Sequence, residues 1–190
     1  MRISGGKARG IELKVPKGDR VRPATDGLRQ AVFSSLAAAI SGARFLDLFA
    51  GSGAYGLEAF SRGATGGLFV ERDARAAACI RQNIEAVARS VGAIGAADLS
   101  VTQADALQIA AAPPGPVPDL VFIDPPYEII PEVAPMLFER LTSLFAGRPS
   151  AIVVFELPGE LDLAPAGWSL VKRLGKGARQ PTAAFFRPKS

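Results

Sequence analysis

The sequence has no histidine and a single cysteine, Cys79. Without histidine, neither a Ser-His-Asp nor a Cys-His catalytic arrangement can form. Histidine-based metal sites are excluded too, and one cysteine can build neither a structural zinc site nor an intrachain disulfide. Any enzymatic chemistry must therefore use carboxylates, amides, hydroxyls, backbone groups and a bound cofactor, and we expect no metal.

Long apolar runs are also missing. None reaches the roughly 18 residues that a membrane span requires, and Met1–Gly10 lacks the apolar centre of a secretory signal. A chain without disulfides suits a reducing compartment, so we expect a cytoplasmic protein with no membrane partner. The 190 residues, 48% of them hydrophobic, are enough for one domain over residues 1–190. In this interpretation residues 1–22 form a basic hairpin or arm and residues 23–190 a catalytic core.

Positive charge is concentrated at the two ends. The net charge is +4, but residues 1–22 carry +5, residues 170–190 carry +6, and the residues between them carry −7. Basic ends around an acidic middle favour a polyanionic partner such as a nucleic acid. The other interpretation is that the ends are solvated and serve only solubility.

Apolar strands alternate with helical segments through most of the chain. The spacing predicts strands over residues 44–49, 67–71, 99–103, 120–124 and 151–155, and helices over 25–40, 54–61, 74–89, from about 106, and over 131–145. This alternation predicts an α/β fold with an open, mostly parallel sheet that helices cover on both faces. Residues 169–174 and 183–187 read as a strand pair. Their connection is too short for a crossover, so they can join the sheet only as an antiparallel pair.

A glycine-rich loop, Asp47–Gly56, closes the first strand and opens a helix. It matches G-x-G-x-x-G, a dinucleotide fingerprint, although a tight turn that binds nothing would also contain these glycines. Asp47 separates the possible ligands, because a carboxylate aimed into the loop suits a cationic amino-acid end and repels a pyrophosphate. It favours S-adenosylmethionine over a nicotinamide cofactor. Glu71 ends the next strand, where a carboxylate can accept both hydroxyls of a ribose. Asp105 follows the third strand, and it can take the amine of an adenine or cap a helix.

The segment Asp124-Pro125-Pro126-Tyr127 follows the apolar strand at 120–123. Two prolines stiffen the turn, which holds the Pro125 carbonyl beside the Asp124 carboxylate. Two such acceptors can hold both protons of a planar amine, and Tyr127 offers a face for base stacking. Hydrogen bonds to a conjugated amine make its nitrogen a better nucleophile, and Asp124 can receive the departing proton. A strand-ending turn with an exposed tyrosine is the alternative.

These motifs together resemble the bacterial small-subunit (16S) rRNA guanine-N2 methyltransferase family of class I S-adenosylmethionine-dependent enzymes. The resemblance spans nearly the whole chain, and its more specific parts are Arg2-Ile3-Ser4-Gly5-Gly6 and Arg22-Pro23-Ala24-Thr25-Asp26. It implies a Rossmann-like methyltransferase sheet, a monomer, and ribosomal RNA within a small-subunit particle as partner. Catalysis would rest on Asp124, Pro125, Pro126 and Tyr127.

The resemblance also implies two larger sets of residues. The donor site would consist of Thr25, Phe33, Asp47, Phe49, Ala50, Gly51, Ser52, Gly53, Glu71, Arg72, Asp105 and Ala106. RNA contacts would come from Arg2, Lys7, Arg9, Arg20, Arg22, Lys176 and Arg179.

The chain departs from the family pattern in two places. The family usually has Asp-Arg-x-Arg-Glu where this chain has Asp26-Gly27-Leu28-Arg29-Gln30, which removes one charge of each sign. Near the end, a Tyr-Gly-Asp-Thr-like segment of the family is replaced by residues 174–179, which keep a glycine but neither the tyrosine nor the acid.

The sequence therefore predicts methyl transfer from S-adenosylmethionine to the exocyclic N2 of a guanine in small-subunit rRNA, with the base unstacked to reach the pocket. The alternatives within this chemistry are methylation of adenine N6 in DNA or of a protein glutamine. Methylation of DNA is disfavoured because the sequence offers no DNA-reading module such as a helix-turn-helix. Methylation of a protein glutamine is disfavoured because the sequence offers no large separate amino-terminal domain. A nicotinamide-dependent oxidoreductase and a non-catalytic RNA-binding protein are the remaining alternatives.

Overall fold

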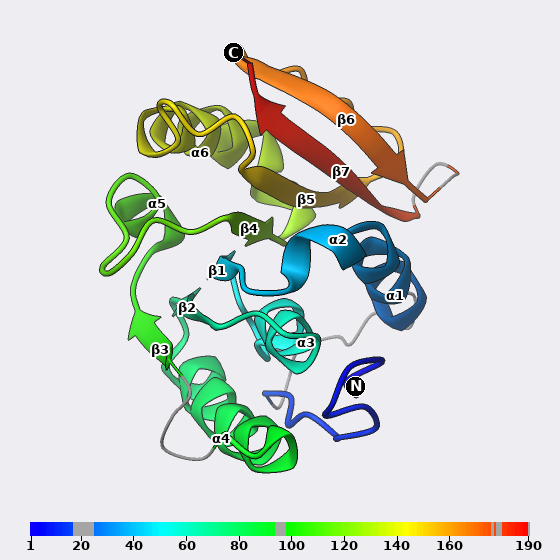
Figure 1. The fold of residues 1–190 in the computed structure, drawn as a ribbon. Helices are drawn as coiled ribbons and strands as arrows, with labels where there is room; N and C mark the ends of the chain where they lie inside the picture. The colour runs from blue at the N-terminus through cyan, green and yellow to red at the C-terminus, as the bar shows by residue number, and fades with distance from the viewer. Residues whose placement is uncertain (17–24, 94–97, 176, 178–179, 190) are drawn as a thin grey trace.

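The structure, a computed structural model, describes residues 1–16, 25–93, 98–175, 177 and 180–189. Within this part of the chain, seven strands form one sheet in the order β3-β2-β1-β4-β5-β7-β6 (Figure 1). The strands are β1 (Arg44–Leu48), β2 (Gly66–Glu71), β3 (Asp98–Gln103), β4 (Leu120–Ile123), β5 (Ile152–Pro158), β6 (Trp168–Leu174) and β7 (Pro181–Pro188). Strands β1 to β5 run parallel, and β7 is antiparallel to both β5 and β6. The predicted fold class is confirmed.

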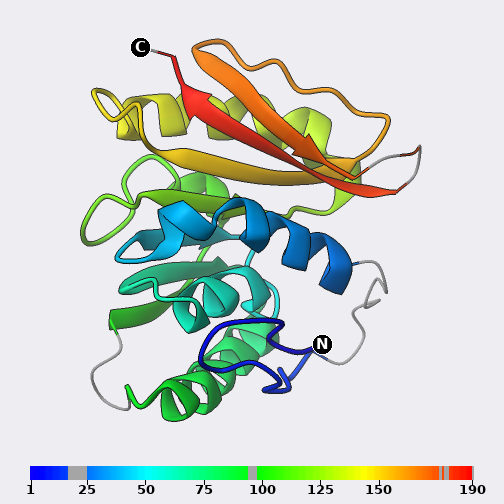
Figure 2. The same ribbon diagram turned by 45° about the vertical axis from the view of Figure 1, so that its right-hand side comes forward.

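The helices are α1 (Thr25–Ser35), α2 (Ala37–Ile40), α3 (Ala54–Ser61), α4 (Ala74–Val91), α5 (Ala106–Ile109) and α6 (Ile130–Leu144). A short 3-10 turn, η1 (Tyr127–Ile129), precedes α6. Helices α1 to α4 pack on one face of the sheet, while α5 and α6 pack on the other (Figure 2). None of these helices is long and apolar enough to cross a membrane.

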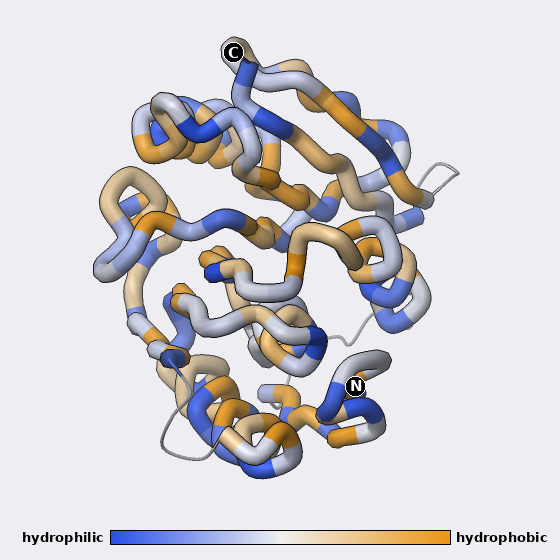
Figure 3. Tube along the Cα trace, viewed as in Figure 1, coloured by the Kyte–Doolittle hydropathy of each residue, from blue (hydrophilic) through white to orange (hydrophobic). Residues whose placement is uncertain are grey.

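Helix α4 shows why its sequence folds as it does. Asp73 caps its first turn, because the carboxylate accepts hydrogen bonds from the backbone N–H groups of Arg75 and Ala76. Gly92 ends the helix in the left-handed conformation, with φ of 75°. Hydrophobic and hydrophilic residues alternate along the helix, so one side packs on the sheet and the other faces solvent (Figure 3).

The single helix expected over residues 25–40 is divided at Leu36 into α1 and α2. The hydroxyls of Ser34 and Ser35 donate to the carbonyl oxygens of Gln30 and Ala31, one turn back. Such hydrogen bonds compete with the helix backbone and bend helices. The prediction placed helical structure correctly over these residues, but it was wrong in expecting one continuous helix.

Residues 1–16 form a hairpin-like segment, which we call the N-terminal hairpin, packed beside α3 and α4 (Figure 1). The N–H of Ile3 donates to the carbonyl of Ile11 over 2.9 Å, and that of Leu13 to the carbonyl of Met1 over 3.0 Å. Ile3 and Leu13 are buried. Gly6 has φ of 78°, and a Cβ there would lie 2.1 Å from the carbonyl oxygen of Ser61. The Gly5-Gly6 pair thus allows the hairpin to touch the end of α3.

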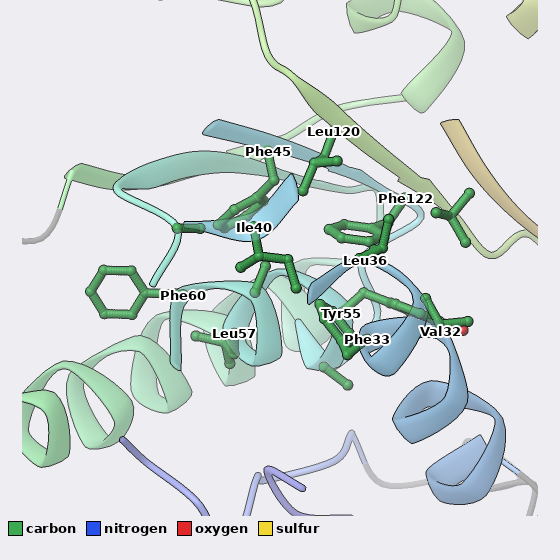
Figure 4. Packing of buried hydrophobic residues seen from close by; sticks show 14 of the residues in the cluster. Val32, Phe33, Leu36, Ile40, Phe45, Tyr55, Leu57, Phe60, Leu120 and Phe122 are labelled. Carbon is green, nitrogen blue, oxygen red and sulfur yellow. The ribbon is translucent and has the colours of Figure 1, made fainter. Parts of the chain in front are cut away.

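An aromatic stack links α1, α3 and the sheet (Figure 4). The rings of Tyr55 and Phe122 are stacked with centroids 5.3 Å apart. Phe33 packs against both rings, with centroid distances of 6.1 and 5.6 Å. Such contacts add to the burial of the rings and hold α3 at a fixed position over β4.

Candidate active site

A cleft of about 990 Å³ opens at the carboxyl ends of the parallel strands. The chain order reverses between β1 and β4, and open α/β sheets bind their ligands at such a point. An acidic side chain from the end of each parallel strand lines the cleft. In the order of the sheet these residues are Asp105 after β3, Glu71 on β2, Asp47 on β1, Asp124 after β4 and Glu156 on β5.

The loop after β1 has an unusual backbone. Gly51 and Gly53 have φ values of 55° and 78°, and Phe49 has φ of 58°, which is uncommon for a residue with a side chain. Such strain is concentrated at functional sites. The Glu71 carboxylate holds the loop, since Oε2 accepts from the N–H of Gly51 over 2.8 Å. Its Oε1 accepts from the N–H of Asp73 over 2.8 Å. Glu71 is therefore fixed at the cleft wall, and each of its oxygens retains capacity for a ligand hydroxyl.

Asp47 is 2% exposed, and its Oδ2 accepts a 2.9 Å hydrogen bond from the N–H of Gly56. Burial, together with the negative charge of Glu71, raises the pKa of Asp47 from 3.8 to about 8, although the Gly56 hydrogen bond opposes the shift. The carboxyl is thus mostly protonated at pH 7 in the free protein. A cation placed in this part of the cleft would favour the ionised form and draw the proton off.

Asp105 fulfils one of its two predicted roles directly. Its side chain accepts a 2.7 Å hydrogen bond from the N–H of Leu107 and so caps α5. The same residue lines the cleft. The cap is therefore confirmed, and the contact with an adenine amine stays a prediction.

Asp124 directly follows β4 and is half-buried, with Pro125 buried and Pro126 exposed. All three residues line the cleft. Tyr127 begins η1 and packs, partly buried, against the apolar cluster under α6. It is next to the cleft and not among the residues that line it, so its role as a stacking platform stays a prediction.

The remaining predicted donor residues separate into four groups. Those that line the cleft beside the acids already described are Phe49, Ala50, Gly51, Ser52, Arg72 and Ala106. Gly53 precedes α3, and its N–H donates to the carbonyl of Ala50 over 2.7 Å. Phe33 is fully buried behind Tyr55, one layer away from the cleft surface. Thr25 is the first residue of α1, but the position of its side chain lies outside the described structure.

The predicted RNA contacts are described only in part. Arg2, Lys7 and Arg9 are exposed on the N-terminal hairpin. Arg20, Arg22, Lys176 and Arg179 lie outside the described residues. In the first segment that departs from the family pattern, Gly27 and Gln30 are exposed on α1, whereas Arg29 between them is buried.

The cleft residues that sequence reasoning missed include Arg29, Tyr55 and Glu156, which are linked to one another or to neighbouring segments by hydrogen bonds. The hydroxyl of Tyr55 donates a 2.8 Å hydrogen bond to Oε2 of Glu156. Arg29 is 2% exposed, and its Nη2 donates to Asp26 and to the backbone carbonyl of Arg2, each over 2.7 Å. Glu156 had a detectable signal, since it directly follows the apolar run Ile152–Phe155, as Asp124 follows the run Leu120–Ile123. Arg29 matches the second arginine of the family's Asp-Arg-x-Arg-Glu pattern, but no local signal indicated its burial, which depends on the N-terminal hairpin.

Comparisons with known proteins identify the family and support the fold. A family model described as conserved hypothetical protein 95 matches residues 1–184. The chain is 35% identical over 172 residues, 90% of this chain and 82% of the relative, to a ribosomal RNA small subunit methyltransferase D of Escherichia coli K12. It is 30% identical over 183 residues, 93% of this chain and 89% of the relative, to the protein of the same name from Haemophilus influenzae. A solved structure of a putative methyltransferase, yhhF from Escherichia coli, superposes with a TM-score of 0.76 at 31% identity, covering 100% of this chain and 98% of that one.

Proposed function

The chain belongs to the family described as conserved hypothetical protein 95, and from this we propose that it methylates the exocyclic N2 amine of a guanine in small-subunit ribosomal RNA with S-adenosylmethionine as donor. The relatives' names support methylation of ribosomal RNA. The observation that carries the finer proposal is the row of acids along one cleft, in which Asp124 and the Pro125 carbonyl come directly after β4.

The donor half of the cleft fits S-adenosylmethionine chemically. Its walls offer acceptors for the polar groups of such a molecule: Glu71 for ribose hydroxyls, Asp105 for the adenine amine, and Asp47 for the cationic amino-acid end. A pyrophosphate would face the Glu71 and Asp105 carboxylates and be repelled, which argues against a nicotinamide cofactor. When bound, S-adenosylmethionine supplies a methyl group on a cationic sulfur that leaves as a neutral thioether.

The acceptor half of the cleft provides what an amine requires. The Asp124 carboxylate and the Pro125 carbonyl can each accept one N–H of the target amine and orient its nitrogen toward the donor half. As the nitrogen forms its new bond it becomes positively charged, and Asp124 stabilises that charge. One N–H proton then passes to the Asp124 carboxylate. We propose Tyr127 and Pro126 as the neighbouring surface for the extruded base.

The exposed Arg2, Lys7 and Arg9 give the N-terminal hairpin a basic surface, which we propose as part of the RNA contact together with the basic residues outside the described structure. We further propose a metal-free monomer with one methyltransferase domain over residues 1–190. Its substrate, RNA within a small-subunit particle, would place it in the cytoplasm.

A transfer assay tests the proposal. The full chain is incubated with S-adenosylmethionine labelled in the methyl group and, separately, with small-subunit particles, naked small-subunit rRNA, genomic DNA and total protein. We expect label in the rRNA, recovered after digestion as N2-methylguanosine. Label in DNA as N6-methyladenine, or in protein glutamine, would replace the proposal with one of the alternatives.

A further inference from the structure

Two carboxylates from neighbouring strands lie side by side in the acceptor half of the cleft. Strands β4 and β5 are parallel, and Ile123 is paired with Phe155. The next position along both strands brings Asp124 beside Glu156, at the spacing of about 4.8 Å between adjacent strands. Phe122 and Val154, two residues earlier, both contribute to the core under α1 and α3. Since side chains alternate between faces, Asp124 and Glu156 belong to this same face.

Glu156 is held in place by its surroundings. It is 2% exposed, yet it lines the cleft, and its Oε2 accepts from the Tyr55 hydroxyl. The Tyr55 ring is in turn fixed by stacking on Phe122 and by contact with Phe33. A carboxylate has about four lone-pair sites, so the bond from Tyr55 does not exhaust its capacity to accept. Glu156 is thus a rigidly placed acceptor with a fixed orientation.

Paired acceptors discriminate between bases. Guanine presents N1–H next to its N2 amine, so these two neighbouring positions both donate. Adenine and cytosine each place an unprotonated ring nitrogen beside their amine, and that nitrogen would face a carboxylate with no hydrogen between them. A buried polar group left without its partner strongly disfavours the wrong ligand.

We infer that Glu156 is the specificity-determining residue of the acceptor site, accepting the N1–H of the target guanine while Asp124 accepts its N2 amine. Tyr55 is the positioning residue that orients Glu156. This inference rests on the proposed function, because it names the groups that would select the base methylated there.

The test compares two bases that share the N2 amine. Small-subunit RNA is prepared with guanine or with 2-aminopurine at the methylated position, and it is assembled into the particle when naked RNA is not a substrate. 2-Aminopurine keeps the N2 amine but has an unprotonated N1. The measured quantity is the ratio of kcat/KM for guanine to that for 2-aminopurine, in the wild type and in Glu156→Gln. The glutamine can still accept from Tyr55, while its amide can donate to an unprotonated N1.

The wild type should prefer guanine, and Glu156→Gln should reduce this preference at least about tenfold. Tyr55→Phe should reduce it in the same direction by a smaller factor, which provides a second variant. Glu139→Gln, an exposed acid on α6 outside the cleft, is the charge-matched control and should leave the ratio unchanged. Equal slowing of both substrates in Glu156→Gln, with the ratio preserved, would overturn the inference and leave the proposed function standing. A wild type that methylates neither RNA would overturn both.

Discussion

The Tyr55 hydroxyl donates a 2.8 Å hydrogen bond to Glu156, 101 residues later in the sequence. This bond joins α3, which follows the glycine loop of the donor half, to the end of β5 in the acceptor half. Burial, followed by the negative charges of Glu156 and Asp124, raises the pKa of Tyr55 well above its usual 10. The hydroxyl therefore keeps its proton, and the two halves of the cleft stay connected throughout the neutral pH range.

Asp47 should make the stability of the free protein depend on pH. Its pKa is raised from 3.8 to about 8 on folding, so the folded state binds the proton more tightly than the unfolded chain does. The resulting stabilisation is complete below about pH 4 and is lost as the pH rises to about 8. Asp47→Asn cannot ionise, so its melting temperature should fall less than that of the wild type between pH 5 and pH 8. If the melting temperatures of the two proteins changed equally with pH over this range, the raised pKa of Asp47 would be contradicted.

The proposed catalytic role of Asp124 predicts that methyl transfer and donor binding respond differently to its substitution. Asp124→Asn should lower the single-turnover rate of methyl transfer by about 10²- to 10⁴-fold, because the neutral amide stabilises the positive amine less than a carboxylate does and cannot receive its proton. Donor affinity, measured by calorimetry with S-adenosylhomocysteine, should change by less than about threefold. Glu139→Gln should alter neither quantity. Transfer at the wild-type rate would remove Asp124 from the mechanism.

Asn83 on α4 connects the N-terminal hairpin to the glycine loop. Its Oδ1 accepts from the N–H of Lys14, while its Nδ2 donates to the carbonyls of Lys14 and Ser52, over 2.8 to 2.9 Å. Asn83 is 1% exposed, so Asn83→Ala should leave buried backbone groups without partners and lower the free energy of unfolding by about 2–3 kcal/mol.

The neighbouring Gln82 provides the control for this variant. It bonds only the exposed Nζ of Lys14 among the contacts described, and Gln82→Ala should cost less than about 0.5 kcal/mol in denaturant unfolding. Equal effects of the two substitutions would mean that the buried amide does not hold the hairpin.

The basic surface of the N-terminal hairpin predicts a salt-dependent RNA affinity. Replacing Arg2, Lys7 and Arg9 together by alanine should weaken binding and reduce the slope of log affinity against log salt by roughly 2, since each lost phosphate contact removes about 0.7–0.9. Filter binding with small-subunit rRNA at several salt concentrations measures this slope. Arg140→Ala on α6 is the control. A triple variant with the wild-type slope would show that the hairpin makes no phosphate contacts.

Much of the sheet and its cleft could be predicted from the sequence because the signals are local. An apolar run followed directly by an acid marked the strand ends at Glu71 and Asp124, Asp47 lay within the first predicted strand just before the glycine loop, and Asp105 followed the third strand. Parallel strands bring such ends to one edge, so the row of acids follows from the strand pattern. Glu156 carries the same signal, because it directly follows the apolar run Ile152–Phe155. It could therefore have been predicted as a fifth acid of the row.

Other features depend on packing between distant segments. Arg29 is buried because the carbonyl of Arg2 and the carboxylate of Glu58 surround it, and neither lies near it in the sequence. The sequence predicts a basic hairpin or arm at the amino-terminal end, but no local pattern indicates that its Ile3 and Leu13 belong to the core or that its Met1 lines the cleft. The raised pKa of Asp47 likewise reflects burial under α3, which no local pattern reports.

The most direct test of the account is a map of modified nucleotides in small-subunit rRNA from a strain that lacks this protein, compared with its parent. We predict the loss of one N2-methylguanosine, its return when the wild-type chain is supplied, and no return with Asp124→Asn. An unchanged set of N2-methylguanosines in the deletion strain would contradict the proposed function.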